Sequence, residues 1–219
     1  MVGCTLFLVS LVSGLAVPDS LTECSSVARR SVADNVLTSR EDPPIRVRVD
    51  RALSYLGHLR FPLKGTACVE RHFFARAENG RVRQLFIFQF EGFLDDNSKV
   101  YRWTVRNPHR LGAEDYHFNT WFFDSARLNA AEPDSESAKT DAFLRSNGLH
   151  LDAELMMARF ARIVGEDKRH EFILFYMEPL KETGMRVADF PDGGPSNSSQ
   201  KELAAKLKER AVASFEVLP

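Results

Sequence analysis

The strongest constraint on the fold of this chain is the dipeptide Asn79-Gly80, which separates two segments rich in phenylalanine. Both residues tolerate positive φ, as a type I′ turn requires. The segment 69–92 is therefore predicted to form a β-hairpin with a two-residue loop. Such a loop fixes the register with Glu78 opposite Arg81, and this register assigns every later residue of the hairpin to one of two faces.

One predicted face of the hairpin is mostly aromatic and is expected to form the main core, with Phe73 opposite Phe86. The other face is predicted to pair Glu70 with Gln89, with Glu91 close by. Apolar side chains are expected beside these polar groups, because the same register pairs His72 with Ile87 and Phe74 with Leu85.

Apolar walls with a few converging polar groups are typical of a ligand pocket. We therefore expect this face to bind a small molecule that is largely apolar or aromatic, and we expect no cofactor. The ligand-binding residues would be Phe74, Leu85, Ile87, Gln89, His117 and Trp121. The alternative is a solvent-facing sheet whose polar groups have no function, since antiparallel sheets often have one wet face.

A carboxylate beside an imidazole can orient it as a general base. This favours a second hypothesis, an acid–base enzyme of the isomerase or hydrolase type. Its catalytic residues would be His72, Glu70 and Glu91. His72 and His117 each lie two residues after a carboxylate, a spacing compatible with a two-histidine metal site. No metal motif is present, and no metal is predicted.

Alternation and apolar runs predict strands at 45–50, 100–106, 116–123 and 171–177, while 52–61 fits either a strand or a short helix. Start and stop signals predict a helix between Asp134 and Gly148. A second helix is predicted from Asp152 to Gly165, because its apolar residues recur at helical spacing. The sum is an α+β fold: a largely antiparallel, curved sheet, barrel-like in one version, with two mid-chain helices and a C-terminal helix packed on it.

The expected domain organisation has four parts. Residues 1–44 would be a leader and a flexible arm, residues 45–191 an α+β core domain, residues 192–198 a linker, and residues 199–219 an amphipathic helix packed on the core. Ser199 and Glu202 form the pattern of a capping box at the start of that last helix.

The apolar segment 5–17 has the length of a signal-peptide core, which predicts a cleaved signal peptide at 1–16 and a secreted or periplasmic protein. The alternatives are a buried element or a cytoplasmic protein with a misassigned start. Cys24 and Cys68 then remain as an even pair that either forms a disulfide or stays as two thiols.

The formal net charge of −1 argues against a nucleic-acid binder that relies on a bulk positive field. No apolar run has the length of a membrane span. The third hypothesis is an exported protein-interaction module. It would dock through the hairpin arginines Arg76, Arg81 and Arg83, or through the terminal helix.

Overall fold

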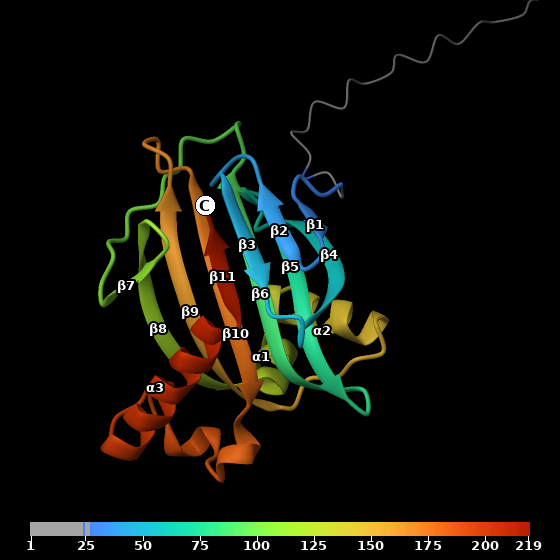
Figure 1. Cartoon of the computed structure of the whole chain (residues 1–219), viewed down its shortest axis with the longest axis vertical. Helices are drawn as coiled ribbons and strands as arrows, with labels where there is room; N and C mark the ends of the chain where they lie inside the picture. The colour runs from blue at the N-terminus through green and yellow to red at the C-terminus, as the bar shows by residue number, and fades with distance from the viewer. Residues whose placement is uncertain (1–23, 25–26) are drawn as a thin grey trace, which may run out of the picture.

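The computed structural model describes residues 24 and 27–219, which form two antiparallel sheets and three α-helices (Figure 1). The large sheet contains, in spatial order, β4 (Ser54–Leu63), β5 (Ala67–Glu78), β6 (Arg81–Phe93), β10 (His170–Pro179), β9 (Glu154–Val164), β8 (Glu114–Asp124) and β7 (Pro108–Leu111). The small sheet contains β1 (Ser31–Ala33), β2 (Val36–Ser39), β3 (Ile45–Val49) and β11 (Phe215–Leu218). The helices are α1 (Ser125–Ala131), α2 (Glu136–Ser146) and α3 (Ser198–Ala213), with two short 3₁₀ turns, η1 (Leu180–Thr183) and η2 (Val187–Asp189).

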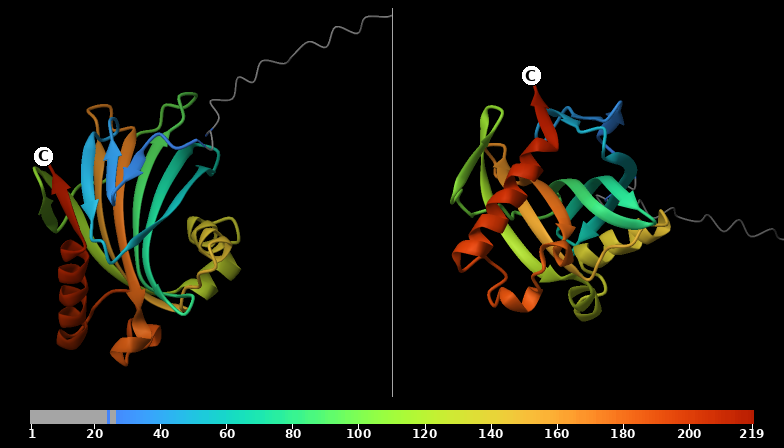
Figure 2. Two further views of the ribbon diagram at one scale, coloured as in Figure 1. Left: turned by 45° about the vertical axis from the view of Figure 1, so that its right-hand side comes forward. Right: turned by 60° about the horizontal axis from the view of Figure 1, so that its bottom comes forward.

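The large sheet lies between two layers. One face, here called the small-sheet face, carries Phe74 and Phe88 and packs with the small sheet and α3 in the main core. The other face, here called the helix face, carries Phe73 and Ile87 and packs with α2 in a second core. The large sheet curves around α1 and α2, and α3 lies on the opposite side (Figure 2). The predicted α+β class is confirmed, and the helices cover both faces.

The sheet is open within the described residues, because its order ends at β4 and β7 and these two strands do not pair. The predicted strands at 45–50, 116–123 and 171–177 are confirmed as β3, β8 and β10, and the ambiguous segment 52–61 belongs to strand β4. The first predicted mid-chain helix is confirmed as α2. Ser135 caps it by accepting a hydrogen bond from the backbone amide of Ala138.

The predicted helix from Asp152 to Gly165 is wrong, because this segment forms strand β9. Strand β9 lies between β8 and β10 and is covered on both faces, so its apolar residues do not alternate. Met156 and Phe160 face the main core, while Leu155 is buried on the other side. The second mid-chain helix is instead α1, for which the sequence analysis predicts no helix.

The expected strand at 100–106 is wrong. Residues 100–106 do not form a strand, and Tyr101 instead stacks on Phe93, with 4.6 Å between the ring centroids. The short edge strand β7 follows immediately and pairs with β8. Proline at the first residue of an edge strand costs no ladder hydrogen bond, which explains how Pro108 begins β7.

The flexible arm predicted for residues 1–44 is wrong for residues 31–39, which form β1 and β2 of the small sheet. Leu37 is completely buried in the main core. The segment therefore belongs to the fold. The signal peptide predicted for residues 1–16 lies outside the described residues.

The hairpin turn at Asn79-Gly80 is confirmed, with φ of 53° and 74°, but the predicted register holds only beside the turn. Glu78 pairs with Arg81 and Ala77 with Val82. A β-bulge then shifts the pairing so that Arg76 faces Gln84. One extra residue in a strand moves every later side chain relative to its partner, so the predicted composition of both faces changes.

The C-terminal helix is confirmed as α3, and Leu207 and Ala211 bury its apolar stripe in the main core. Its capping box uses Asn197 and Gln200 in place of the predicted Ser199 and Glu202. The helix ends at Ala213, whereas it was predicted to continue to 219. Phe215–Leu218 form β11, which pairs with β3.

Candidate functional site

The bulge in the hairpin divides the predicted polar patch between the two faces of the large sheet. Glu70, His72 and Phe74 lie on the small-sheet face, because they pair with Phe90, Phe88 and Phe86 of the main core. Gln89, Ile87 and Leu85 pair with Arg71, Phe73 and Ala75 on the helix face. The predicted single face that would carry all six residues is therefore wrong.

The remaining predicted site residues lie on the helix face. Cross-strand partners lie on the same face of a sheet. Successive cross-strand pairs from β8 to β6 connect Trp121 with Leu85 through Met157 and Met177. The corresponding pairs connect His117 with Gln89 through Ala161 and Ile173. Glu91 lies opposite Val69 and belongs to the same face. His72 and His117 therefore lie on opposite faces, with three strands between theirs, and cannot share a metal.

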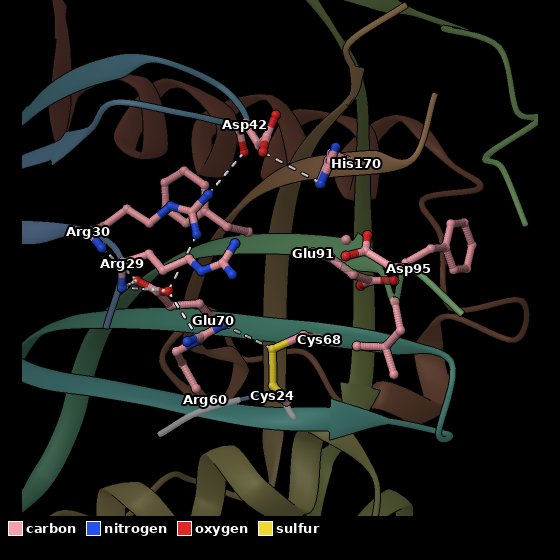
Figure 3. A pocket seen from close by; sticks show the side chains of 14 residues that line it. Cys24, Arg29, Arg30, Asp42, Arg60, Cys68, Glu70, Glu91, Asp95 and His170 are labelled. Carbon is pink, nitrogen blue, oxygen red and sulfur yellow. Dashed lines mark hydrogen bonds and ion pairs between the residues drawn. A yellow bond between two sulfur atoms is a disulfide. The ribbon is translucent and has the colours of Figure 1, made fainter. Parts of the chain in front are cut away.

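Glu70 is buried on the small-sheet face and anchors the chain that precedes β1 (Figure 3). Its carboxylate accepts hydrogen bonds from the backbone amides of Arg29, at 3.0 and 3.2 Å, and Arg30, at 3.1 Å. The guanidinium groups of Arg30 and Arg60 lie 3.4 and 3.3 Å from Oε2. Burial opposes the charge, but the donors from His72, Arg29 and Arg30 outweigh it and lower the pKa of Glu70 to about 2.

Both ring nitrogens of His72 are engaged. Nε2 lies 2.8 Å from Oε1 of Glu70, and Nδ1 lies 3.0 Å from the hydroxyl of Tyr55. Burial lowers the pKa of His72, so the neutral ring donates from Nε2 to the carboxylate and accepts from Tyr55 at Nδ1. No lone pair of this buried ring is left to take a proton from a substrate.

A small polar cleft of about 180 Å³ lies beside this anchor, and Glu70, Arg30 and His170 are among its lining residues. The disulfide between Cys24 and Cys68 forms one of its walls (Figure 3). Several polar groups that line the cleft are paired: Glu70 lies 3.4 Å from Arg30, and Asp42 lies 3.6 Å from Nε2 of His170. The side chain of Glu70 in this cleft therefore holds the segment before β1 against the large sheet.

A larger cavity of about 420 Å³ lies on the helix face, between the large sheet and helices α1 and α2. Its walls are mainly apolar and come from four strands and one helix: Ile87, Phe175, Met177, Leu155, Met157, Trp121, Phe123 and Leu128. The volume lies within the range of about 300–1,000 Å³ that is usual for small-molecule pockets. Ile87 and Trp121 were predicted to bind a ligand.

Arg71 lies at the polar end of this cavity and is 5% exposed. Nε donates to Oε1 of Gln89 at 2.6 Å, and Nη1 donates to the backbone carbonyl of Glu136 at 2.8 Å and to Oγ1 of Thr140 at 2.6 Å. Nη2 donates to the Glu136 carboxylate. The guanidinium is thereby fixed between β5, β6 and α2, as a buried charge requires.

Two further carboxyl groups lie on the helix face. Glu91 accepts hydrogen bonds from the hydroxyl of Tyr101 at 2.6 Å and from Gln89 at 3.0 Å, and burial raises its pKa. Glu171 pairs with Glu91 across the strands, and Arg159 donates to it at 2.9 Å. Burial raises the pKa of Glu171 to about 7, although the charge of Arg159 opposes this.

The opposite end of the cavity is apolar and open. Trp121 and Leu128 line it and are 37% and 48% exposed, and they are two of the four large hydrophobic side chains that are exposed in the described part of the chain. Exposed apolar side chains gathered at a cavity are a mark of a binding site. The backbone amide of Phe122 donates to the carbonyl of Gly193 at 2.8 Å, which holds the 190–194 loop against this end.

The predicted ligand-binding residues thus have different positions. Gln89 does not line the cavity but accepts a hydrogen bond from Arg71, which does. Leu85 is buried in the second core, nearer the hairpin turn. His117 accepts a hydrogen bond from the backbone amide of Arg106 at 2.9 Å and does not line the cavity. Phe74 is in the main core on the other face.

Arg71, Glu136, Thr140 and Leu128 were not predicted as site residues. One signal was available for Arg71: the sequence places a charged residue on a hairpin face that is otherwise aromatic. A charge in such a position is rarely buried without a partner. Its partners could not be identified, because they lie 65 and 69 residues further along the chain.

Within residues 24 and 27–219, no group of three or more histidine, cysteine, aspartate or glutamate side chains is placed to hold a metal ion. In the same part of the chain, no helix combines the length and the apolar character that a membrane crossing needs. Comparison of the chain with protein-family models, with curated proteins and with solved structures found no match.

Proposed function

We propose that this protein binds a small, largely apolar or aromatic molecule in the cavity between the large sheet and helices α1 and α2. The observation that carries the proposal is the combination of apolar walls, a buried polar end at Arg71 and an exposed apolar mouth at Trp121 and Leu128. A few fixed polar groups in an apolar cavity orient a ligand, while the apolar walls supply most of the affinity.

The size and the lining of the cavity support this proposal over the polar cleft. The cleft is less than half as large, and its buried carboxylate Glu70 is already paired with Arg30 and Arg60. The walls of the larger cavity are mainly apolar, and its mouth at Trp121 and Leu128 is exposed. Apolar surface that stays in contact with water favours association with an apolar molecule.

The enzyme and interaction hypotheses receive less support from the geometry. His72 has both nitrogens bonded and does not line either cavity, so it lacks access to a substrate. Two of the three hairpin arginines have acidic partners, Arg81 with Asp152 and Arg83 with Glu78 and Glu182. The apolar stripe of α3 is already buried in the main core.

A titration with the neutral apolar dye Nile red tests the proposal. We expect saturable binding with a blue-shifted emission, because the dye would leave water for an apolar cavity. Met157→Trp fills the cavity and should abolish this binding. Leu128→Ser removes part of the mouth and should weaken it severalfold.

Val105→Ser is the matched control for Leu128→Ser. Both wild-type side chains are large, apolar and exposed, at 42% and 48%, and only Leu128 lines the cavity. Circular dichroism and the melting temperature show whether each variant keeps the fold. Equal dye binding by wild-type protein and a folded Met157→Trp variant would place the dye elsewhere and overturn the proposal.

The disulfide between Cys24 and Cys68 supports a second, simpler proposal about location. Disulfides persist mainly in oxidising compartments, so we expect a secreted or periplasmic protein. The mass of the protein from its natural source, measured with and without reductant after alkylation, tests this. Alkylation of both thiols without reductant would contradict an oxidising compartment.

A further inference from the structure

We infer that the cavity selects a ligand whose polar end is a neutral hydrogen-bond acceptor, such as an ester or a ketone carbonyl, rather than a carboxylate or an amine. This inference rests on the proposed function and concerns the same cavity. It follows from the hydrogen bonds and the charges at the polar end, where Arg71, Glu136, Ser137 and Thr140 line the wall.

The polar end carries donors that remain free to bind a ligand. Oγ1 of Thr140 accepts a hydrogen bond from Arg71. The hydroxyl proton of Thr140 therefore points away from Arg71 and can be donated to a ligand. Ser137 lies three residues earlier on α2 and adds a second hydroxyl to the same wall. Residues three apart on a helix share a face, so both hydroxyls serve the same end of the cavity.

The charges at this end are already balanced. Arg71 is 5% exposed and is bound to the carboxylate of Glu136. The carboxylate of a ligand would therefore lose its hydration without gaining an unpaired cation as a partner. Glu91 and Glu171 lie near enough to Glu136 for the three groups to repel one another. An anionic ligand would add a further negative charge near these carboxyl groups, while the guanidinium of Arg71 is already paired with Glu136, and this disfavours the ligand.

A cationic ligand is disfavoured for the complementary reason. The carboxylate of Glu136 is the acidic group at the polar end, and Arg71 already donates to its Oε2 and to its backbone carbonyl. An ammonium group would have to compete with a fixed guanidinium and would lie beside it. A neutral carbonyl leaves the ion pair intact and accepts from Thr140.

The topology also gives the ligand a direction and a shape. The polar end lies at β5 and the exposed mouth at β8, which is four strands away in the sheet order. With strands spaced about 4.8 Å apart, the path between the two ends along the curved sheet is roughly 19 Å. The ligand would therefore be elongated, with its polar end innermost and its apolar end toward Trp121.

The test compares four probes built on a chain of ten carbons, to which the ester adds one methyl group: decane, methyl decanoate, decanoate and decylammonium. Trp103→Phe leaves Trp121 as the single tryptophan, since the chain has two, and its fluorescence then reports binding at the mouth. We expect the ester to bind about tenfold more tightly than decane and than either ionised probe, because only the ester gains a hydrogen bond without burying a charge.

Two variants at position 140 identify the donor. Thr140→Val keeps the shape and removes the hydroxyl, so the preference for the ester over decane should disappear. Thr140→Ser keeps the hydroxyl and should keep the preference. Equal affinity for ester and decanoate, with decane still bound, would overturn this inference and leave the proposed function standing. Failure of all four probes to bind a folded protein would overturn both.

Discussion

Glu70 and Arg71 are adjacent in the sequence, and their side chains serve opposite layers of the molecule. Glu70 binds the segment before β1 on the small-sheet face, and Arg71 binds α2 on the helix face. Successive residues of a strand point to opposite faces, so this single dipeptide ties the large sheet to both covering layers. Both side chains are almost completely buried, and both are charged.

We expect Glu70→Gln to destabilise the protein by about 3–5 kcal/mol, because it leaves two buried guanidinium groups without their carboxylate. Arg30 and Arg60 have side chains that are 7% and 6% exposed. Urea unfolding followed by fluorescence measures the change. Glu216→Gln breaks an exposed ion pair with Arg48 and should cost less than about 1 kcal/mol. Similar losses in both variants would contradict the role of Glu70 as a buried anchor.

Removal of the disulfide with Cys68→Ser should lower the free energy of unfolding by about 4 kcal/mol, since the bond closes a loop with a sequence separation of 44. The reason is the greater conformational freedom of the unfolded chain without the bond. Urea unfolding of the variant, and of wild-type protein in reductant, measures the change. Reductant should have little further effect on the variant. A stability that does not respond to either change would show that the bond does not constrain the unfolded state.

Glu171 should make the protein less stable as the pH rises. Its pKa is about 7 in the folded protein and has an ordinary value of 4.5, so the folded state holds this proton more tightly than the unfolded chain does. Stability therefore falls between about pH 4.5 and pH 7. We expect Glu171→Gln to lose less stability across this window than the wild-type protein, as measured by the melting temperature.

Glu182→Gln is the control for this pH dependence, because Glu182 is exposed and forms a surface ion pair with Arg83. It should leave the slope of stability against pH unchanged. A wild-type slope in the Glu171→Gln protein would assign the effect to another group, and Glu91 would be the next to test, since burial also raises its pKa.

Phe143→Ala should loosen α2 in particular. The Phe143 ring stacks on Phe73, with 4.2 Å between centroids, and joins α2 to the helix face. We expect a loss of about 1–3 kcal/mol, with faster hydrogen exchange in α2 than in α3, since stability is distributed unevenly over a fold. Nile red binding should weaken as well, because α2 covers the cavity. An equal increase of the hydrogen-exchange rate in α2 and α3 would show that the two layers unfold together.

The parts of the fold that could be predicted are those encoded by neighbouring residues. The hairpin turn depends on Asn79 and Gly80 alone, and the start of α2 depends on its cap at Ser135. The bulge near Arg83 could not be predicted, because apolar side chains occur on both faces beyond it and fit either register. The segment of β9 was predicted to be a helix for a related reason. Burial on both faces removes the alternation of apolar and polar residues that marks a strand.

Ligand binding stays a prediction, and the predicted site residues differ from the residues that line the cavity. An apolar pocket with a polar end was expected on the hairpin, and Ile87 and Trp121 lie on such a cavity. The polar group at its end is Arg71, whose partners Glu136 and Thr140 come from a helix distant in the sequence. The predicted catalytic residues Glu70 and His72 lie on the other face of the sheet. There Glu70 binds the backbone of the segment before β1, which was predicted to be a flexible arm.

The small sheet is assembled from strands of both ends of the described chain, since β11 pairs with β3. During synthesis on the ribosome, β3 is made long before residues 215–218 exist. Until then its edge has unpaired backbone groups, and open strand edges are sites of aggregation. Pairing with β11 therefore covers an edge of β3 that would otherwise be open to strands of other chains.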